Sequence, residues 1–225
     1  MVIEKTTTSI QRLANQLSDD VREVYTSMIP EYQQSYADYV YKDIDKEITI
    51  LKRKKNLEKS FRKLLSEVYF YVTPMSQVTA EEIIKDWTYE VPYNYYDFVA
   101  NVVDSEKLLS SEERENHYFQ VIRNGALVGF TEFMLEDNEL KINLGMKPKY
   151  IGQGWGRDFF QAIEAFAVEK YVFEKMFIVV ADFNKRAQKL FQNAGFKKTA
   201  ESQEQVTDDT HVHVVKMIKE KEARE

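Results

Sequence analysis

Apolar side chains recur with a helical period through the first 66 residues. Before Pro30 they follow three- and four-residue steps, at Ile10, Leu13, Leu17, Val21, Val24 and Met28. A second series runs from Tyr32 to Leu65, and its phase slips near Ile50. The pattern predicts helices on both sides of Pro30, with Thr8 or Ser9 as the first cap. Two amphipathic helices cannot bury their apolar faces alone, so we expect them to pack on each other, on the rest of the chain or on another subunit.

Four basic residues, 52–55 (KRKK), interrupt the apolar stripe of the second series. The interruption is compatible with a helix break or a strongly solvated turn at this point. For its role, we favour a solvated helix face over a binding site for an anion or a nucleic acid.

From Val68 onward the pattern changes to short β-rich segments. The run VYFYVTP predicts a strand that stops at Pro74, and Thr79 then predicts the capped start of a helix that continues to Trp87. An aromatic segment, residues 87–98 (WTYEVPYNYYDF), follows. Its rings are suited either to the wall of a substrate cleft or to core packing, and both alternatives stay open.

The remainder of the chain alternates strands and helices. Asn124-Gly125 joins residues 119–123 and 126–135, which predicts a tight hairpin. We further expect strands at 139–146, 175–181, 196–200 and 211–218, and helices at 159–171 and 184–194. The apolar run 175–181 predicts a strand that is covered on both faces. The helix 184–194 is expected to turn Ala187, Leu190, Phe191 and Ala194 inward and to end at Gly195.

Glycine is concentrated at one place in this chain. Of seven glycines, four lie in residues 139–157, at Gly145, Gly152, Gly154 and Gly156. Three of them precede a predicted helix, where backbone N–H groups without an obstructing Cβ converge on an anion, so we interpret the segment as a diphosphate-binding loop. The spacing excludes a dinucleotide fingerprint, a kinase loop and a Walker loop. A glycine-rich turn without a ligand remains the alternative.

Composition and charge bound the class of protein. The 225 residues are 44% hydrophobic, contain no long apolar run and begin without a signal-peptide pattern, so we expect a soluble cytoplasmic protein that does not enter a membrane. The absence of cysteine excludes disulfides, thiolate metal sites and a cysteine nucleophile. A net charge of −6 argues against a nucleic-acid-binding surface spread over the whole molecule, and we expect no nucleic-acid partner. Residues 67–225 carry 19 basic and 27 acidic residues, which favours a cationic partner such as an amine.

Two segments resemble the GNAT (GCN5-related N-acetyltransferase) superfamily. LGMKPKYIGQGWGRDFF, residues 144–160, is similar to its pyrophosphate loop and helix, and VADFNKRAQKLFQNAGF, residues 180–196, is similar to the strand, Asn-x-x-Ala helix and Gly-Phe ending that follow. WTYEVPYNYY, residues 87–96, resembles a segment of a bacterial subgroup. The resemblance covers about residues 69–219. It implies an α/β fold with a mixed central β-sheet flanked by helices, so that a helical N-terminal region (1–66) precedes a GNAT-like domain (67–225).

The resemblance also implies acetyl-CoA as the acetyl donor and a set of residues that hold it. The strand ending at Met146 would splay from the strand ending at Ala181, and the pantetheine arm would enter the gap. Backbone groups of Leu144 and Met146 would bind that arm, with the Met146 N–H polarising the thioester carbonyl. The remaining contacts would come from the loop amides and two helix positions, namely Ile151, Gly152, Gln153, Gly154, Trp155, Gly156, Arg157, Asn184 and Phe191. Asn184 is also compatible with a plain helix cap.

Several positions depart from the pattern of the superfamily. Ile151 stands where an arginine or glutamine usually opens the loop, and Phe191 stands where a tyrosine often serves as the acid for the departing thiolate. Phenylalanine has no proton to donate, although a thiol pKa of about 8.5 makes the thiolate a tolerable leaving group. Lys141 and Asn143 replace an acidic residue and a glycine that are frequent in the subgroup.

The sequence therefore predicts direct transfer of an acetyl group from acetyl-CoA to a primary amine of an unidentified acceptor. Glu132 and Glu139 are the candidates for the general base, and surface carboxylates are the alternative for both. His211 and His213 are spaced for a metal, but no third ligand accompanies them, so we expect no metal site. The alternative function is a degenerate acyl-CoA sensor or a scaffold that acts through its N-terminal helices. Those helices are also candidates for a homodimer interface.

Overall fold

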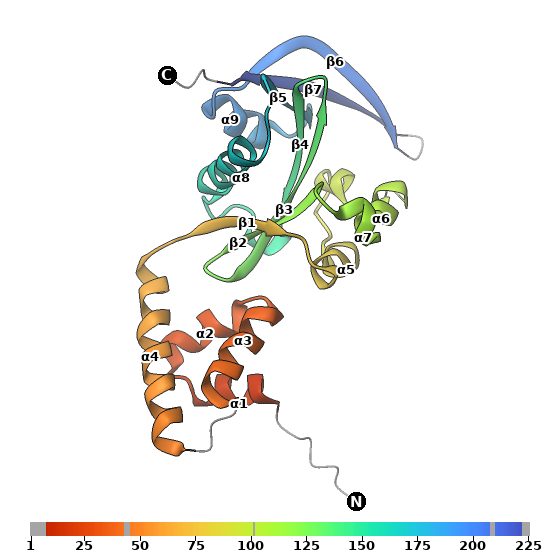
Figure 1. The fold of residues 1–225 in the computed structure, drawn as a ribbon. Coiled ribbons are helices and arrows are strands. Elements are labelled where there is room, and N and C mark those ends of the chain that lie inside the picture. Colours follow the sequence, from red (N-terminus) through yellow and green to blue (C-terminus); the bar gives the residue numbers. More distant parts are fainter. Residues whose placement is uncertain (1–7, 43–45, 101, 208–209, 222–225) are drawn as a thin grey trace, which may run out of the picture. The chain divides into compact units, whose positions relative to one another are not determined.

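The computed structural model describes residues 8–42, 46–100, 102–207 and 210–221. Two compact units divide the chain: a helical unit, Met1–Phe70 with Ile122–Leu127, and a sheet unit, Tyr71–Val121 with Val128–Glu225. The elements, shown in Figure 1, are α1 (Ser9–Gln16), α2 (Asp19–Ser27), α3 (Pro30–Tyr41), α4 (Glu47–Ser66), β1 (Phe70–Pro74), α5 (Gln77–Asp86), η1 (Tyr93–Tyr96), η2 (Phe98–Ala100), α6 (Val102–Leu109), α7 (Ser111–Arg114), β2 (Tyr118–Arg123), β3 (Ala126–Glu136), β4 (Glu139–Met146), η3 (Pro148–Tyr150), α8 (Gly156–Lys170), β5 (Lys175–Ala181), α9 (Lys185–Asn193), β6 (Lys197–Thr207) and β7 (Thr210–Glu220).

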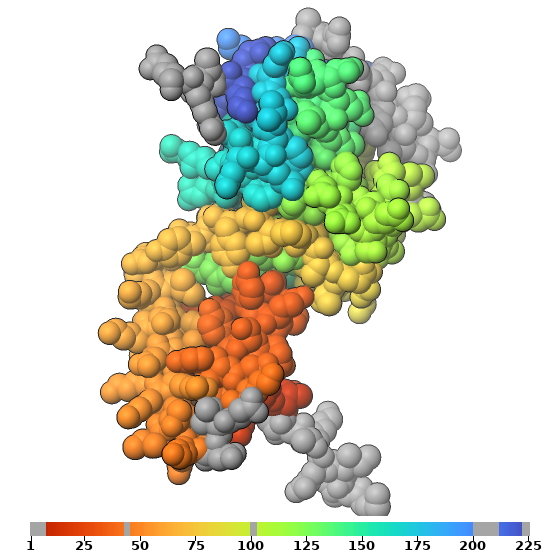
Figure 2. All heavy atoms as spheres, in the orientation of Figure 1, coloured from red at the N-terminus to blue at the C-terminus, as the bar shows by residue number. Residues whose placement is uncertain are grey.

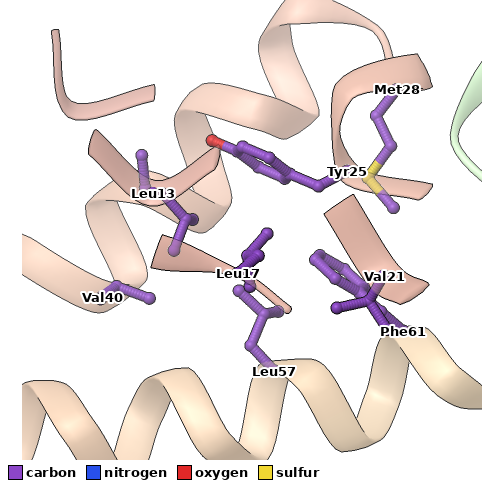
Figure 3. Close-up of a cluster of buried hydrophobic side chains, with 9 residues drawn as sticks. Leu13, Leu17, Val21, Tyr25, Met28, Val40, Leu57 and Phe61 are labelled. Atoms are coloured by element: carbon purple, nitrogen blue, oxygen red, sulfur yellow. The ribbon is translucent and has the colours of Figure 1, made fainter. Parts of the chain in front are cut away.

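The four helices of the helical unit pack on each other. Helix α1 begins at a capping box, in which the Thr8 hydroxyl accepts the Gln11 N–H at 3.2 Å and the Gln11 side chain accepts the Thr8 N–H at 3.1 Å. Apolar side chains from all four helices meet in one core, drawn in Figure 3, that consists of Leu13, Leu17, Val21, Tyr25, Met28, Ala37, Val40, Leu57 and Phe61. Of the three predicted ways to cover their apolar faces, the helices therefore use each other.

The helix boundaries in this unit differ in two ways from those that the apolar periodicity predicts. Instead of one helix before Pro30 there are two, because Arg22 donates hydrogen bonds to the carbonyls of Ala14 (3.0 Å) and Leu17 (2.9 Å) and so satisfies the end of α1. The chain is also helical through residues 52–55, so a break there is wrong, and α4 begins at Glu47. The solvated helix face is confirmed, and α4 forms much of the outer surface of this unit in Figure 2.

The tip of the β2–β3 hairpin belongs to the helical unit. Asn124 and Gly125 have φ of 48° and 87°, as the predicted two-residue turn requires. The Gly125 carbonyl accepts the Ile29 N–H at 2.8 Å, and Asn124 Nδ2 donates to the Leu64 carbonyl at 2.7 Å. A Cβ on Gly125 would lie 2.7 Å from the Met28 side chain, so only glycine fits. The turn therefore completes the packing of a unit that lies far away in sequence.

The described strands form one seven-stranded sheet in the order β1-β2-β3-β4-β5-β7-β6. Strand β4 pairs antiparallel with β3, and β7 pairs antiparallel with both β5 and β6, whereas β4 and β5 are parallel. The mixed sheet and the predicted order of strands along the chain are confirmed.

Helices cover both faces of the sheet unit. On β2, Phe119 contacts Phe166 of α8 (ring centroids 4.8 Å apart), while the next residue, Gln120, accepts a hydrogen bond of 2.6 Å from Thr79 of α5. Because successive side chains of a strand point to opposite faces, α5 and α8 lie on opposite sides of the sheet. Figure 1 shows the same arrangement, with α9 beside α8 and with α6 and α7 beside α5.

Several element predictions need correction. Helix α5 is capped by Ser76 rather than by Thr79, since the Ser76 hydroxyl accepts the Thr79 N–H at 3.2 Å. Helices α6 and α7 were not predicted. Strands β6 and β7 extend beyond their apolar segments because each provides the other with a ladder of backbone hydrogen bonds, which overrides weak intrinsic preference. Strand β5 alternates between buried and half-buried residues, so it is not fully covered on both faces.

Candidate functional site

Strands β4 and β5 are paired only at their beginnings. The parallel register joins Glu139–Lys141 to residues 175–177 and then stops. Beyond it the strands no longer pair, and a pocket of about 950 Å³ is lined by residues from both, including Leu144, Met146, Val179 and Ala181. The splayed strand ends that the family resemblance implied are present.

Backbone groups on both strand ends face this opening. The Lys147 N–H donates to Val128 of β3 at 2.8 Å, so by alternation Leu144 and Met146 direct their N–H and C=O groups away from β3. The Asp182 N–H donates to the His213 carbonyl at 2.7 Å, so Ala181 likewise directs its N–H away from β7. The two strands therefore direct toward the pocket backbone groups that take no part in strand pairing, of which the Met146 carbonyl and the Ala181 N–H are hydrogen-bonded to tyrosine hydroxyls.

The glycine-rich loop forms one end of the pocket. Gly152 and Gly154 have φ of +83° and +80°, and a Cβ on either would meet no other atom within 4 Å. The space beside their backbone is therefore open to a ligand. No side chain of the described residues caps the start of α8, so the helix N-terminus is available to an anion.

The predicted loop residues do not all occupy the same position. Residues 151, 152 and 154–157 line the pocket, with Arg157 exposed at its mouth. Gln153 does not line it, and its side chain donates to the Lys149 carbonyl at 3.2 Å. The N–H of Ile151 already donates to the Pro148 carbonyl at 3.1 Å, so the open amides of the loop begin after it.

Asn184 lies at the start of α9 and lines the pocket. Its Oδ1 accepts the Ala187 N–H at 3.1 Å, which is the plain helix cap considered from the sequence. Its Nδ2 donates to the hydroxyl of Tyr96 at 3.2 Å, and that hydroxyl also accepts the Ala181 N–H at 3.1 Å. Asn184 thus links the end of β5 to the aromatic segment.

Phe191 lies on α9 and closes the pocket with an apolar ring. It is buried and packs edge-on against Phe160 (5.3 Å between centroids) and Phe196 (5.7 Å). The ring lines the pocket but supplies no titratable group at this position.

The aromatic segment contributes to both cleft and core. Trp87 is buried and contacts Phe130, which is core packing. Five other rings line the pocket, namely Tyr89, Tyr93, Tyr95, Tyr96 and Phe98. The Tyr89 hydroxyl donates to the Met146 carbonyl at 3.0 Å, and burial raises the pKa of Tyr89 above the ordinary value of 10.0, so it remains a neutral donor. One short segment therefore contacts the ends of both β4 and β5.

Glu132 lies in the pocket, half-buried, on β3. Asn143 of β4 donates to its Oε2 at 2.7 Å. Burial raises the pKa of Tyr118 above its usual 10.0, and the neighbouring negative charge and hydrogen bond of Glu132 raise it further. The carboxylate is therefore held by two neighbours inside the pocket.

Glu139, the second candidate base, is not among the residues that line the pocket. It lies at the closed end of the β4–β5 pair, where it forms ion pairs with Lys175 (2.8 Å) and Lys216 (3.6 Å). The hydrogen bond from Lys175 and the positive charge of both lysines lower its pKa below 4.5. The geometry brings Glu132, and not Glu139, to the opening.

His211 and His213 are the residues that the sequence spaced for a metal. No group of three or more His, Asp or Glu side chains suitable for a metal is found in the described part of the chain, and the side chain of His211 lies outside the described residues. In the same residues no helix is long and apolar enough to span a membrane.

Sequence reasoning missed two groups that the fold brings to this site. Tyr96 reaches the end of β5 from a segment 85 residues away, and Asn143 orients Glu132 across a strand pair. The crowding of aromatic residues around Pro92 was the available signal for Tyr96. It did not indicate which ring would reach the strand ends.

Comparison with known proteins adds independent support for the fold. The chain resembles a GNAT-family acetyltransferase of Bacillus anthracis (12% identity, TM-score 0.55, 67% of this chain and 94% of that chain). It also resembles an uncharacterized protein of Bacillus halodurans (17%, 0.53, 68% and 85%). A third structure is a dodecameric spermidine N-acetyltransferase of Vibrio cholerae (17%, 0.51, 69% and 94%). At these identities the likeness concerns the fold alone.

Sequence comparison identifies the family. None of the curated proteins is a significant match to this chain. The model of the acetyltransferase (GNAT) family matches residues 76–196, more than half of the chain, and this range includes the glycine-rich loop, Glu132, Asn184 and the aromatic segment. The chain therefore belongs to the acetyltransferase (GNAT) family.

Proposed function

We propose that this protein transfers the acetyl group of acetyl-CoA directly to a primary amine, with no covalent adduct of the enzyme. Acetyl-CoA is the acetyl donor of the family. The observation that carries the proposal is the single pocket in which the glycine-rich loop, the splayed strand ends and a carboxylate meet.

The residues present fit the donor. The open space beside Gly152 and Gly154 admits a diphosphate to the backbone amides at the start of α8, and Arg157 adds positive charge. Leu144 and Met146 offer backbone groups to the pantetheine arm in the way of an added strand. Ile151, Trp155, Gly156 and Phe191 complete the wall.

The chain's own groups supply the chemistry around the donor. A lysine-like amine with a pKa of about 10.4 must lose a proton, which costs roughly 4 to 5 kcal/mol at pH 7. Glu132 takes that proton directly or through water, while Asn143 fixes the carboxylate. The Met146 N–H faces the opening and stabilises the negative charge that develops on the carbonyl oxygen.

The acceptor is an amine of a kind that the carboxylates and aromatic rings of the pocket suit. Carboxylates of Asp97, Asp104 and Glu132 line the pocket together with six tyrosines, and Lys107, Lys141, Arg157 and Arg186 also line it. Carboxylates and the faces of aromatic rings both attract alkylammonium groups. Acetylation of spermidine by one structurally similar protein makes a polyamine a reasonable first acceptor to test.

Calorimetry with acetyl-CoA and thiol release across a panel of amines test the proposal. The panel contains spermidine, a lysine peptide and a peptide with a free N-terminal alanine. We expect binding and turnover of at least one amine. Binding without turnover on an extended panel would favour the second candidate, an acyl-CoA sensor, which the apolar Phe191 supports. An absence of binding would leave only the scaffold function.

We also propose that the helical region 1–66 and the domain 67–225 are distinct in role, with the helices joining two copies of the chain. Ile48, Leu51 and Leu65 of α4 are between 52% and 65% exposed, and a second copy of the chain would cover them. Sedimentation of the full chain tests this idea. A dimer that Leu51→Glu converts to a monomer would support it, and a monomeric wild type would contradict it.

A further inference from the structure

The Tyr96 hydroxyl accepts two hydrogen bonds at the end of β5. The donors are the Ala181 N–H at 3.1 Å and Asn184 Nδ2 at 3.2 Å. The Asn184 amide is oriented by its other end, where Oδ1 accepts the Ala187 N–H, so nitrogen rather than oxygen faces Tyr96. A phenolic hydroxyl has one proton and can accept from two donors. Both acceptor positions are therefore occupied, and the proton of Tyr96 must point elsewhere.

That direction is the pocket. Tyr96 lines it, and within the described residues the hydroxyl has hydrogen-bond partners only in Ala181 and Asn184, both of which donate. The Ala181 N–H marks the end of β5 at the opening, across from Met146 at the end of β4. A ligand that enters between the two strands therefore meets the Met146 N–H on the β4 side and the phenolic proton of Tyr96 on the β5 side.

Phe191 cannot act as a proton donor in this pocket. It lines the same pocket, yet a phenyl ring cannot protonate a leaving group. The other tyrosine with an assigned hydrogen bond at the strand ends, Tyr89, donates its proton to the Met146 carbonyl and is committed to that contact. Of the two tyrosine hydroxyls that bond to the strand ends, Tyr96 is therefore the one whose proton is not committed to a strand.

We propose that Tyr96 is the general acid that protonates the sulfur leaving group during acetyl transfer. This inference rests on the proposed function. The amine nitrogen forms a bond to the carbonyl carbon, the carbon–sulfur bond breaks with its electron pair going to sulfur, and sulfur takes the proton of Tyr96. The ammonium first loses one proton to Glu132, which passes it to solvent, and the nitrogen loses its second proton to Glu132 after the new bond forms. Solvent takes that proton from Glu132 as well and returns one proton to Tyr96, so the products are an acetamide, a free thiol and one proton released to solvent.

The surroundings of Tyr96 suit this role. Burial raises the pKa of Tyr96 above 10.0, which keeps its proton in place at neutral pH, while the Asn184 and Ala181 donors act in the opposite direction. The same two donors stabilise the tyrosinate that forms after proton transfer. The site therefore holds the proton before the reaction and stabilises the negative charge after it.

Ligand binding tests the contact without turnover. Coenzyme A and its desulfo analogue are titrated calorimetrically at pH 8.5 into the wild type, Tyr96→Phe and Tyr171→Phe. Tyr171 donates its hydroxyl to the Asn116 carbonyl and is not among the pocket-lining residues, so it controls for the loss of a tyrosine hydroxyl. We expect the wild type and Tyr171→Phe to bind coenzyme A about tenfold more tightly than the analogue, and Tyr96→Phe to lose this preference.

Two results of the titration would overturn the proposal. The first is a wild type that shows no preference for coenzyme A. The second is a Tyr96→Phe variant that keeps the preference; if its affinity for both ligands falls equally, Tyr96 acts only as a tether between the aromatic segment and β5.

Kinetics with spermidine, or with another panel amine that turns over, supply the second measurement. We expect Tyr96→Phe to lower kcat by about 10²-fold with little change in KM for acetyl-CoA. An unchanged kcat would overturn the assignment. If the wild type acetylates no amine, the proposed function fails, while the comparison of coenzyme A with its desulfo analogue still decides whether Tyr96 reaches the sulfur.

Discussion

Nδ2 of Asn143 lies 2.7 Å from Oε2 of Glu132, and the two residues are direct partners in the β3–β4 register. One strand carries the carboxylate, and its neighbour holds that carboxylate in a fixed rotamer at the pocket. The pair therefore couples sheet register to the position of the proposed base.

Glu132→Gln removes the base while keeping a side chain of the same shape. We expect kcat for a lysine-like amine to fall by about 10²-fold, because the ammonium must then lose its proton to water. An amine with a pKa near 8 loses its proton more readily, so the fall in kcat for that amine should be smaller. Steady-state kinetics on two amines check this. Glu139→Gln, on a residue outside the pocket lining, is the matched control, and equal losses in the two variants would refute the role of Glu132.

Gly154→Ala tests the glycine-rich loop. The substitution places a Cβ in the open space at a φ of +80° and should weaken acetyl-CoA binding by at least about tenfold, because it blocks approach to the amides. Gly195→Ala is the control, since Gly195 also has a positive φ (+95°) but does not line the pocket. Both variants should lose about 1 to 2 kcal/mol of unfolding free energy from backbone strain.

The two glycine variants separate strain from binding. Calorimetry gives the affinity for acetyl-CoA, and urea unfolding gives the stability. If Gly154→Ala binds as tightly as Gly195→Ala, the loop does not hold the diphosphate.

Asn124→Gly tests the hairpin tip within the helical unit. Glycine keeps the positive φ of 48° but removes the hydrogen bonds to the Leu64 carbonyl (2.7 Å) and from the Tyr69 N–H (2.8 Å). We expect a loss of about 1 kcal/mol of unfolding free energy, because a part-buried and an exposed backbone group lose their partners. Asn124→Ala should lose about a further 1 kcal/mol through the strain of a left-handed residue. Equal stability of the wild type and Asn124→Gly in urea would show that these contacts contribute nothing.

The ion pairs of Glu139 should make the thermal stability of the protein depend on pH. Its ion pairs lower the folded-state pKa below the unfolded value of 4.5, so its contribution is fully present above pH 4.5 and is lost as the pH falls through the folded-state pKa. Glu139→Gln should therefore have a lower Tm than the wild type at pH 7, and the two should converge in acid. Calorimetric scans between pH 3 and 7 measure the difference. A gap that widens in acid would contradict the ion-pair account.

Local patterns were sufficient for most elements and for the loop. The strand at 139–146, the Asn124-Gly125 turn and the cap at Thr8 follow from short-range rules of alternation, positive φ and side-chain capping, and all three are confirmed. The glycine-rich loop was visible because three glycines before a helix are costly unless something requires their backbone. Such features depend on neighbours in sequence, so the sequence by itself determined them.

The tertiary structure decided what depends on residues far apart in the chain. The choice between Glu132 and Glu139 rests on which end of the β4–β5 pair stays closed, and periodicity along one strand carries no information on that point. Tyr96 meets Ala181 across 85 residues, and the hairpin tip meets the helical unit across about 60. Register and packing between distant segments place these groups, because a side chain's partners are set by the strands and helices that surround it in space.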